Sequence, residues 1–181
     1  MHPNNVRQRS GASFLKQLPA RVLATTLLLA AQAQALPGDS AQDFLLQADK
    51  QLFDQKNGLV TYTGSARLQQ GSLIIEAEHI IIHFKHDNSV AKVEASGSPA
   101  HFQQQPQADK GIVFAEADKI VYDHEQRTVT LSRGAKIAQD GATMQGHSIH
   151  YDLIRELINA QSDEGSNERI KMVIPAGAAG K

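Results

Sequence analysis

The stretch from Leu59 to Phe84 alternates between apolar and polar side chains with a period of two residues, and this alternation constrains the fold more than any other feature of the chain. In its first half the apolar or small positions are Val60, Tyr62, Gly64, Ala66 and Leu68. Such a pattern is typical of a β-strand that buries one of its two faces. Gln70, Gly71 and Ser72 then predict a turn, because glycine and short polar residues favour turn conformations.

The second half of this stretch changes its parity. Its apolar positions are Leu73, Ile75 and Ala77, followed by Ile80, Ile82 and Phe84. A strand with one buried face cannot move its apolar side chains from odd to even positions without an extra residue or a sharp bend. The sequence therefore predicts a bulge or a corner around Glu78.

The same unit recurs along the chain. Three leading glycines, Gly64, Gly97 and Gly134, are separated by 33 and 37 residues, a spacing typical of stacked supersecondary repeats. Each copy also contains a small residue followed three positions later by isoleucine. These pairs are Ala77 and Ile80, Ala117 and Ile120, and Gly146 and Ile149. The pattern predicts an all-β chain, built as an antiparallel stack of bent β-hairpins.

Residues 1–35 have the composition of a secretory signal peptide. Four basic residues precede or flank a short apolar segment at 22–31, and small residues at Ala33 and Ala35 suit a cleavage site. An uncleaved membrane anchor is the alternative, but the apolar segment is shorter than the roughly 20 residues needed to span a bilayer. We therefore expect a cleaved leader at 1–35, one domain at 36–175 and a flexible tail at 176–181.

The charge and the cysteine content exclude several classes of function. Four of the 18 basic residues and none of the 19 acidic residues lie in the predicted leader, so the exported chain carries a formal charge near −5. Nucleic-acid binding depends on neutralising phosphates, and this balance argues against it. The chain has no cysteine, which excludes disulfides, thiol chemistry and cysteine-ligated zinc.

Two sets of polar residues are candidates for chemistry. His79 and His83 share a strand face and could bind a metal, or they could be solvent-facing positions of a half-buried sheet. The carboxylates Glu76, Glu78, Glu116 and Asp118 could form an acid pair of the glycosidase kind, or they could be charges on a solvated face. The carboxylates recur with the repeat opposite the apolar positions, and the histidines fit the polar positions of a half-buried sheet. We therefore expect no catalytic residue, no metal site, no cofactor and no enzymatic activity.

The apolar face has two interpretations that periodicity cannot separate. Two sheets that face each other could bury it as the dry core of a sandwich. Bent hairpins could instead hold the sheets apart and form an apolar trough.

Several short segments resemble the OstA-like family, in particular its LptA group of periplasmic lipopolysaccharide transport proteins. These are the segment Asp39–Asp54, the run Val60–Gly64, the Ala-[Glu/Asp]-x-Ile corners, the segment Pro99–Phe102 and the closing Arg169–Pro175. Each is short and unspecific, but their order and spacing together resemble the family over residues 42–175. The glutamine-rich loop at 103–110 is a mild departure.

The resemblance implies a bent, V-shaped β-jellyroll (a "β-taco") with an apolar interior trough, localised in the periplasm. It implies that the chain carries lipopolysaccharide from the inner to the outer membrane, with the lipid A acyl chains sheltered from water. The partners it implies are further copies joined head-to-tail, an LptC-like inner-membrane protein and the N-terminal domain of an LptD-like outer-membrane protein. An exported, self-assembling structural β-repeat protein without lipid cargo is the alternative.

On this basis we expect eleven apolar side chains to face the interior and some of them to contact acyl chains. They are Phe44, Leu46, Val60, Tyr62, Leu68, Ile75, Ile82, Phe102, Ile120, Tyr122 and Leu131.

Overall fold

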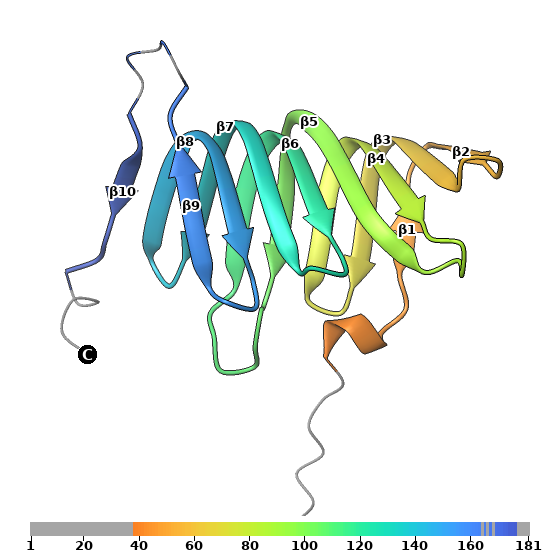
Figure 1. Ribbon diagram of the computed structural model, residues 1–181, viewed down its shortest axis with the longest axis horizontal. Helices are drawn as coiled ribbons and strands as arrows, with labels where there is room; N and C mark the ends of the chain where they lie inside the picture. Colours follow the sequence, from red (N-terminus) through yellow and green to blue (C-terminus); the bar gives the residue numbers. More distant parts are fainter. Residues whose placement is uncertain (1–37, 164, 166, 168, 177–181) are drawn as a thin grey trace, which may run out of the picture. The chain divides into compact units, whose positions relative to one another are not determined.

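A computed structural model of the chain describes residues 38–163, 165, 167 and 169–176, in which ten β-strands form one antiparallel sheet (Figure 1). The helix found in this part of the chain is a three-residue 3-10 helix, η1 (Asp39–Ala41). Within the same residues, no helix has the length and the hydropathy to cross a membrane. The predicted leader at 1–35 lies outside the described residues, as do residues 177–181 of the predicted tail.

The sheet consists of six long strands and four short ones. The long strands are β3 (Leu59–Gln70), β4 (Leu73–Phe84), β5 (Val90–Gln104), β6 (Val113–Asp123), β7 (Thr128–Gln139) and β8 (Ala142–Asp152). The short strands are β1 (Leu45–Gln47), β2 (Lys50–Asp54), β9 (Leu157–Gln161) and β10 (Lys171–Val173). β1 and β2 both pair with β3, and β9 and β10 both pair with β8. The prediction of an all-β, bent antiparallel jellyroll built from stacked hairpins is confirmed.

Each long strand is divided by a corner, where the register between neighbours shifts. In β3 the pairing breaks between Thr63 and Ala66, and in β7 it breaks between Ser132 and Ala135. The corners create two facing layers. One contains β2 and β9 at its edges and is called the β2/β9 layer; the other contains β1 and β10 and is called the β1/β10 layer. The predicted parity change in β4 lies at this corner, between Glu76 and His79.

The recurrent glycines mark the corners of the outgoing strands. Gly64 in β3 and Gly134 in β7 have φ angles of 84° and 65°, in the left-handed region that glycine adopts at low cost. Gly64 is also a point of close approach. A Cβ atom there would lie 2.3 Å from Oδ2 of Asp49, whose backbone N–H donates to the Gly64 carbonyl at 3.1 Å. A bulge of this kind, with one glycine beside Ser65 or Arg133 at positive φ, bends the chain without breaking the sheet.

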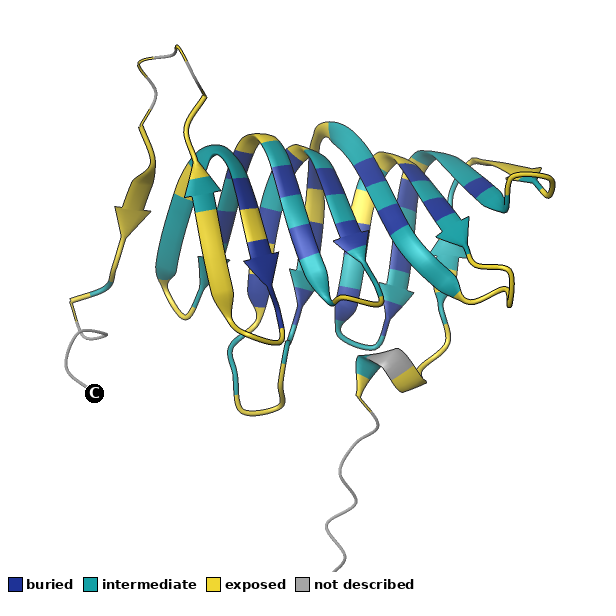
Figure 2. Ribbon diagram, viewed as in Figure 1, coloured by how far each residue is buried: buried dark blue, intermediate teal, exposed yellow. Residues whose placement is uncertain are grey.

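The small residue of each repeat lies where the two layers converge. Beside the corner, the inner face of the β1/β10 layer presents Ala66, Ala77, Ala100, Ala117, Ala135 and Gly146. Farther from the corner the inner residues are larger, and they include Leu68, Ile75 and Phe102. Buried bands therefore cross the strands on the inner face (Figure 2). The space between the layers is thus a wedge, narrow at the corner and wider away from it. The small residue of each repeat lies at the narrow end, and the isoleucine three positions later is the first inner residue of the opposite layer.

Enlarging an alanine at the corner should destabilise the protein. Leucine at Ala117, which is 1% exposed, would force the two layers apart at their narrowest point and should cost about 1–3 kcal/mol of unfolding free energy. Leucine at Ala138, a partly exposed position on the outer face of the neighbouring strand, should change the same free energy by less than about 0.5 kcal/mol. Urea unfolding of Ala117→Leu and Ala138→Leu would measure both values, and equal effects would contradict the wedge.

Candidate functional site: the apolar interior

The interior between the two layers is formed by rows of apolar side chains that run from strand to strand. In the β2/β9 layer one row consists of Val60, Ile82, Val93, Tyr122, Val129 and Tyr151. In the β1/β10 layer a facing row consists of Leu68, Ile75, Phe102, Ala115, Ile137 and Met144. The rings of Phe102 and Tyr122 meet across the interior, with their centroids 6.0 Å apart. The two layers are therefore in direct contact through their side chains.

The eleven residues predicted for the interior are buried or half-buried. Val60, Leu68, Ile75, Ile82, Phe102, Ile120, Tyr122 and Leu131 are buried. Phe44, Leu46 and Tyr62 are half-buried and pack against the core cluster. Val60 differs from the other buried residues of this set because it lies near the β2 edge and is not part of the core cluster. Contact of these side chains with acyl chains stays a prediction.

The inner rows continue outward to the edge strands, and the sequence analysis missed these last members. Phe53 in β2 is opposite Val60, and Ile158 in β9 is opposite Tyr151. Side chains directly opposite in an antiparallel pair share a face, so both belong to the inner rows. In the β1/β10 layer, Met172 of β10 is opposite Met144. The alternation in β2, β9 and β10 spans only three to five residues, which is too short for a periodicity argument to identify an inner face.

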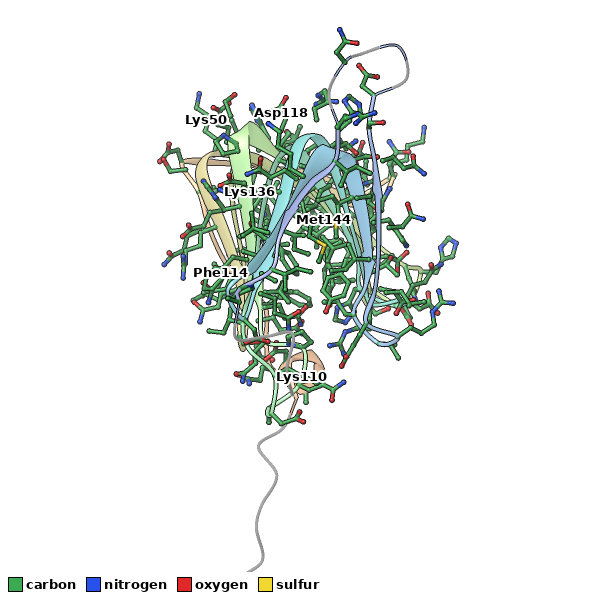
Figure 3. The ribbon with its side chains drawn as sticks, turned by 90° about the vertical axis from the view of Figure 1, so that its left-hand side faces the viewer. Lys50, Lys110, Phe114, Asp118, Lys136 and Met144 are labelled. Carbon is green, nitrogen blue, oxygen red and sulfur yellow. The ribbon has the colours of Figure 1, made fainter. Side chains whose placement is uncertain are left out.

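These last members leave apolar surface exposed at both ends of the sheet. Phe53 is 57% exposed at one end, and Met172 is 55% exposed at the other. Figure 3 looks at the end that carries β10, and shows Met144 between the two layers and Phe114 outside them. The apolar interior is therefore continuous from one edge of the sheet to the other, and is accessible at the edges.

The side of the interior that faces away from the corner is closed near η1 by polar contacts. The Asp39 carboxylate accepts hydrogen bonds from the Ser72 backbone N–H at 2.8 Å, the Ser72 hydroxyl at 2.5 Å and Nε2 of Gln104 at 3.1 Å. Gln70, which is buried, donates from Nε2 to the Gln42 carbonyl at 2.9 Å. The segment that carries η1 is thus fastened to the ends of β3 and β5. We call this side of the interior the mouth.

A polar cluster surrounds Tyr122 at the mouth. Burial raises the pKa of the Tyr122 hydroxyl, while the charge of Arg127 and hydrogen bonds from Gln104 and Arg127 oppose that rise. The His124 ring lies edge-on to Phe44 at 5.5 Å and to Tyr122 at 6.0 Å. Burial lowers the pKa of His124, and the positive charges of Arg127 and Lys85 add to this effect. Polar side chains therefore line the interior at the mouth.

Three of the four candidate carboxylates are paired with cations on the outer face. Glu76 pairs with Arg67, Glu116 pairs with Lys136 at 3.2 Å, and Asp118 pairs with Arg133 at 3.5 Å. His79 lies 3.3 Å from the Thr63 hydroxyl, and His83 lies 2.9 Å from the Glu94 carboxylate. Over the described part of the chain, no group of three or more metal-ligating side chains is found. The geometry favours a solvated face over an acid pair or a metal centre.

Comparison with known proteins identifies the family. Residues 45–156 match the family described as LptA/(LptD N-terminal domain) LPS transport protein. The chain belongs to this LptA/LptD N-terminal domain family. Lipopolysaccharide export system protein LptH of Pseudomonas aeruginosa is 33% identical over 166 residues, which cover 89% of this chain and 95% of LptH. Lipopolysaccharide export system protein LptA of Escherichia coli K12 is 29% identical over 146 residues, covering 80% of this chain and 78% of LptA.

A solved structure agrees with this family. The crystal structure of Pseudomonas aeruginosa LptH, described as the LptA-homologous periplasmic component of the conserved lipopolysaccharide transport device, matches with a TM-score of 0.70 and 33% identity. The match covers 77% of this chain and 99% of the LptH chain. The family resemblance inferred from the short motifs is therefore confirmed, and these relatives are transport proteins.

The most strongly paired carboxylate of this family member should make its stability depend on pH. Hydrogen bonds from Lys119 and Lys92 lower the pKa of Glu94 to about 2, against the weaker opposing effect of desolvation. A lowered pKa in the folded state stabilises the protein above the unfolded pKa, and this stabilisation is lost as the pH falls towards 2. We expect the unfolding free energy of Glu94→Gln to decrease less between pH 4.5 and pH 2 than that of the unmodified protein. Parallel slopes in urea titrations at these pH values would contradict the assignment.

Proposed function

We propose that the chain is a periplasmic carrier that moves lipopolysaccharide from the inner to the outer membrane, with the acyl chains in the apolar interior. The main support for this proposal is that the inner apolar rows continue without interruption to exposed residues at both ends of the sheet. A conduit between membranes needs an apolar path that is open at its two ends. The periplasmic location is that of the family relatives, and it fits the predicted leader at 1–35.

The energetics of this role are favourable only if the two layers separate. Side chains fill the interior, since residues such as Leu68, Phe102 and Ile120 are at most 2% exposed. When the layers separate, these side chains lose their contacts with the opposite layer, and an acyl chain between the layers can provide new apolar contacts in their place. Each methylene group removed from water is worth about 0.8 kcal/mol, so a chain of about twelve carbons gains on the order of 10 kcal/mol before the cost of separation. The polar head group can remain in solvent at the mouth.

Site-specific photo-crosslinking should distinguish a lipid carrier from a structural repeat protein. A benzophenone amino acid in place of Phe102, which is 2% exposed and inward-facing, should capture lipopolysaccharide. The same amino acid in place of Phe114, which is 51% exposed on the outer face of the adjacent strand, should capture little. Phe44 should behave as Phe102 does, and Thr61 and Arg67 as Phe114 does.

Immunoblotting for a lipopolysaccharide adduct measures the outcome. Equal capture at Phe102 and Phe114 would show that lipopolysaccharide does not bind preferentially in the interior. Capture at none of these positions would favour the structural protein without cargo, in which the interior is a dry core.

Head-to-tail assembly is the second part of the proposal, and the edge strands support it. β3 and β8 run in opposite directions, because five antiparallel pairings separate them. A second copy in the same orientation would therefore present its β1 antiparallel to β10, and its β2 antiparallel to β9. Both layers could continue across one joint through main-chain hydrogen bonds. The same edges would accept related domains of an LptC-like inner-membrane protein and of an LptD-like outer-membrane protein.

A charge on the inner side of β10 should prevent this joint. Met172→Lys places an ammonium group in the inner row, where the next copy would bury it, whereas Val173→Lys places the same group on the outer side of the same strand. An unpaired buried charge costs more than about 1.4 kcal/mol, so Met172→Lys should raise the concentration for half-assembly at least about tenfold. Val173→Lys should raise it much less. Light scattering across a concentration series measures both, and an equal effect of the two variants would contradict a joint that extends the inner rows.

A further inference from the structure

Three buried polar atoms without a hydrogen-bond partner gather around Tyr122. Among the described residues, four buried side-chain atoms lack such a partner, and three of them are Oε1 of Gln104, Nδ1 of His124 and Nε of Arg127. The fourth, Nε2 of His83, lies on the outer face 2.9 Å from the Glu94 carboxylate. Buried polar atoms are almost always satisfied, and a cluster of exceptions marks a place where water or another polar group can bind.

The orientation of the Gln104 amide is fixed by its neighbours. Its Nε2 donates to Oδ2 of Asp39 at 3.1 Å, and a carboxylate can only accept hydrogen bonds. The amide therefore cannot turn its oxygen towards Asp39. Oε1 remains as an acceptor without a donor, on a residue that is 1% exposed. A group that satisfies this oxygen must carry a hydrogen-bond donor and must reach it from the interior.

Arg127 supplies the complementary donor. Its Nε–H is buried and has no acceptor, and none of the described carboxylates forms an ion pair with its guanidinium group. The charge of Arg127 and the side chain of Gln104 both act on the Tyr122 hydroxyl. The residue with the orphan acceptor and the residue with the orphan donor thus interact with the same tyrosine, and the His124 ring lies 6.0 Å from the ring of that tyrosine. The Phe102 ring, 6.0 Å from that of Tyr122, connects this polar cluster to the apolar rows.

We propose that Gln104, Arg127 and His124 form a polar subsite that binds the amide linkage between an acyl chain and its head group. The amide N–H would donate to Gln104 Oε1, and the amide carbonyl would accept from Arg127 Nε–H. An ester has the carbonyl but no donor, so it would leave the Gln104 oxygen unsatisfied. The interior would thereby favour amphiphiles with an amide-linked chain over ester-linked membrane lipids, because a buried acceptor without a donor is costly. This inference rests on the proposed lipid-carrier function and specifies its substrate class.

Two probes that differ in one group test the subsite on the full mature chain. N-(2-hydroxyethyl)dodecanamide and 2-hydroxyethyl dodecanoate have the same length and differ by N–H against O. Displacement of a lipophilic dye below the micellar concentration would give the dissociation constant of each. The unmodified protein should bind the amide about tenfold more tightly, the discrimination expected from one buried hydrogen bond. Purified lipopolysaccharide is measured in the same assay as a test of the carrier function.

Substitutions by methionine, which remove a polar group and keep an unbranched side chain, assign the preference to individual residues. Gln104→Met removes the acceptor and should reduce the preference for the amide to about onefold. Arg127→Met removes a donor that both probes use, so it should weaken both to a similar extent. Arg133→Met is the matched control, because Arg133 also has a positive φ but lies exposed at a corner, and it should change neither constant. The ratio of the two constants within one preparation does not depend on how much of a variant is folded.

Each outcome decides between the two proposals. Lipopolysaccharide binding without a preference for the amide would overturn the subsite and leave the carrier function intact, as would a preference that survives Gln104→Met. A preference for the amide without lipopolysaccharide binding would overturn the carrier function and support the subsite. Failure to bind any of the three ligands would overturn both.

Discussion

The corner that divides every long strand is the constraint on which the rest of the structure depends. An alternating strand has only two faces, so a sheet that folds onto itself must keep the same face inward on both sides of the fold. The outgoing strands β3 and β7 each have one residue more at the corner than the returning strand beside them, at glycine-containing bulges around Gly64 and Gly134. The returning strand β4 changes the parity of its inner residues around Glu78. Without this change of parity, half of β4 would expose its apolar residues.

The long strands and their corners could be predicted from the sequence because both leave a repeated pattern. The parity change around Glu78 and the three spaced glycines each mark a corner in the structure. The sequence shows the recurring small residues but not the reason for them. The two layers converge at the corner, and this convergence depends on the arrangement of both layers and not on one strand. The eleven expected interior residues occupy the apolar positions of alternating strands, and these positions face the interior, so all eleven are buried or half-buried.

Other features of the site could not be predicted, because they depend on partners distant in sequence. Phe53, Ile158 and Met172 belong to strands too short to show a period, and only their register with β3 and β8 assigns them to an inner row. The polar cluster at the mouth joins Asp39 to Gln104 over 65 positions. The sequence predicts a loop at 103–110, whereas β5 extends to Gln104, which continues the inward alternation of Ala100 and Phe102. Tertiary pairing, and not propensity, selects these residues.

The number of strands in each layer has a consequence for direction. Each layer contains eight strands, the six long ones and two at the edges, and neighbours alternate in direction. With an even number, the two edges of a layer run in opposite directions, so copies add by translation without turning over. With an odd number, a copy added by translation would meet its neighbour through parallel strands. A filament that grows by translation has a polarity, with one end that presents β1 and β2 and another that presents β9 and β10. Because the two ends of such a filament present different strands, each end can bind a different partner at a different membrane.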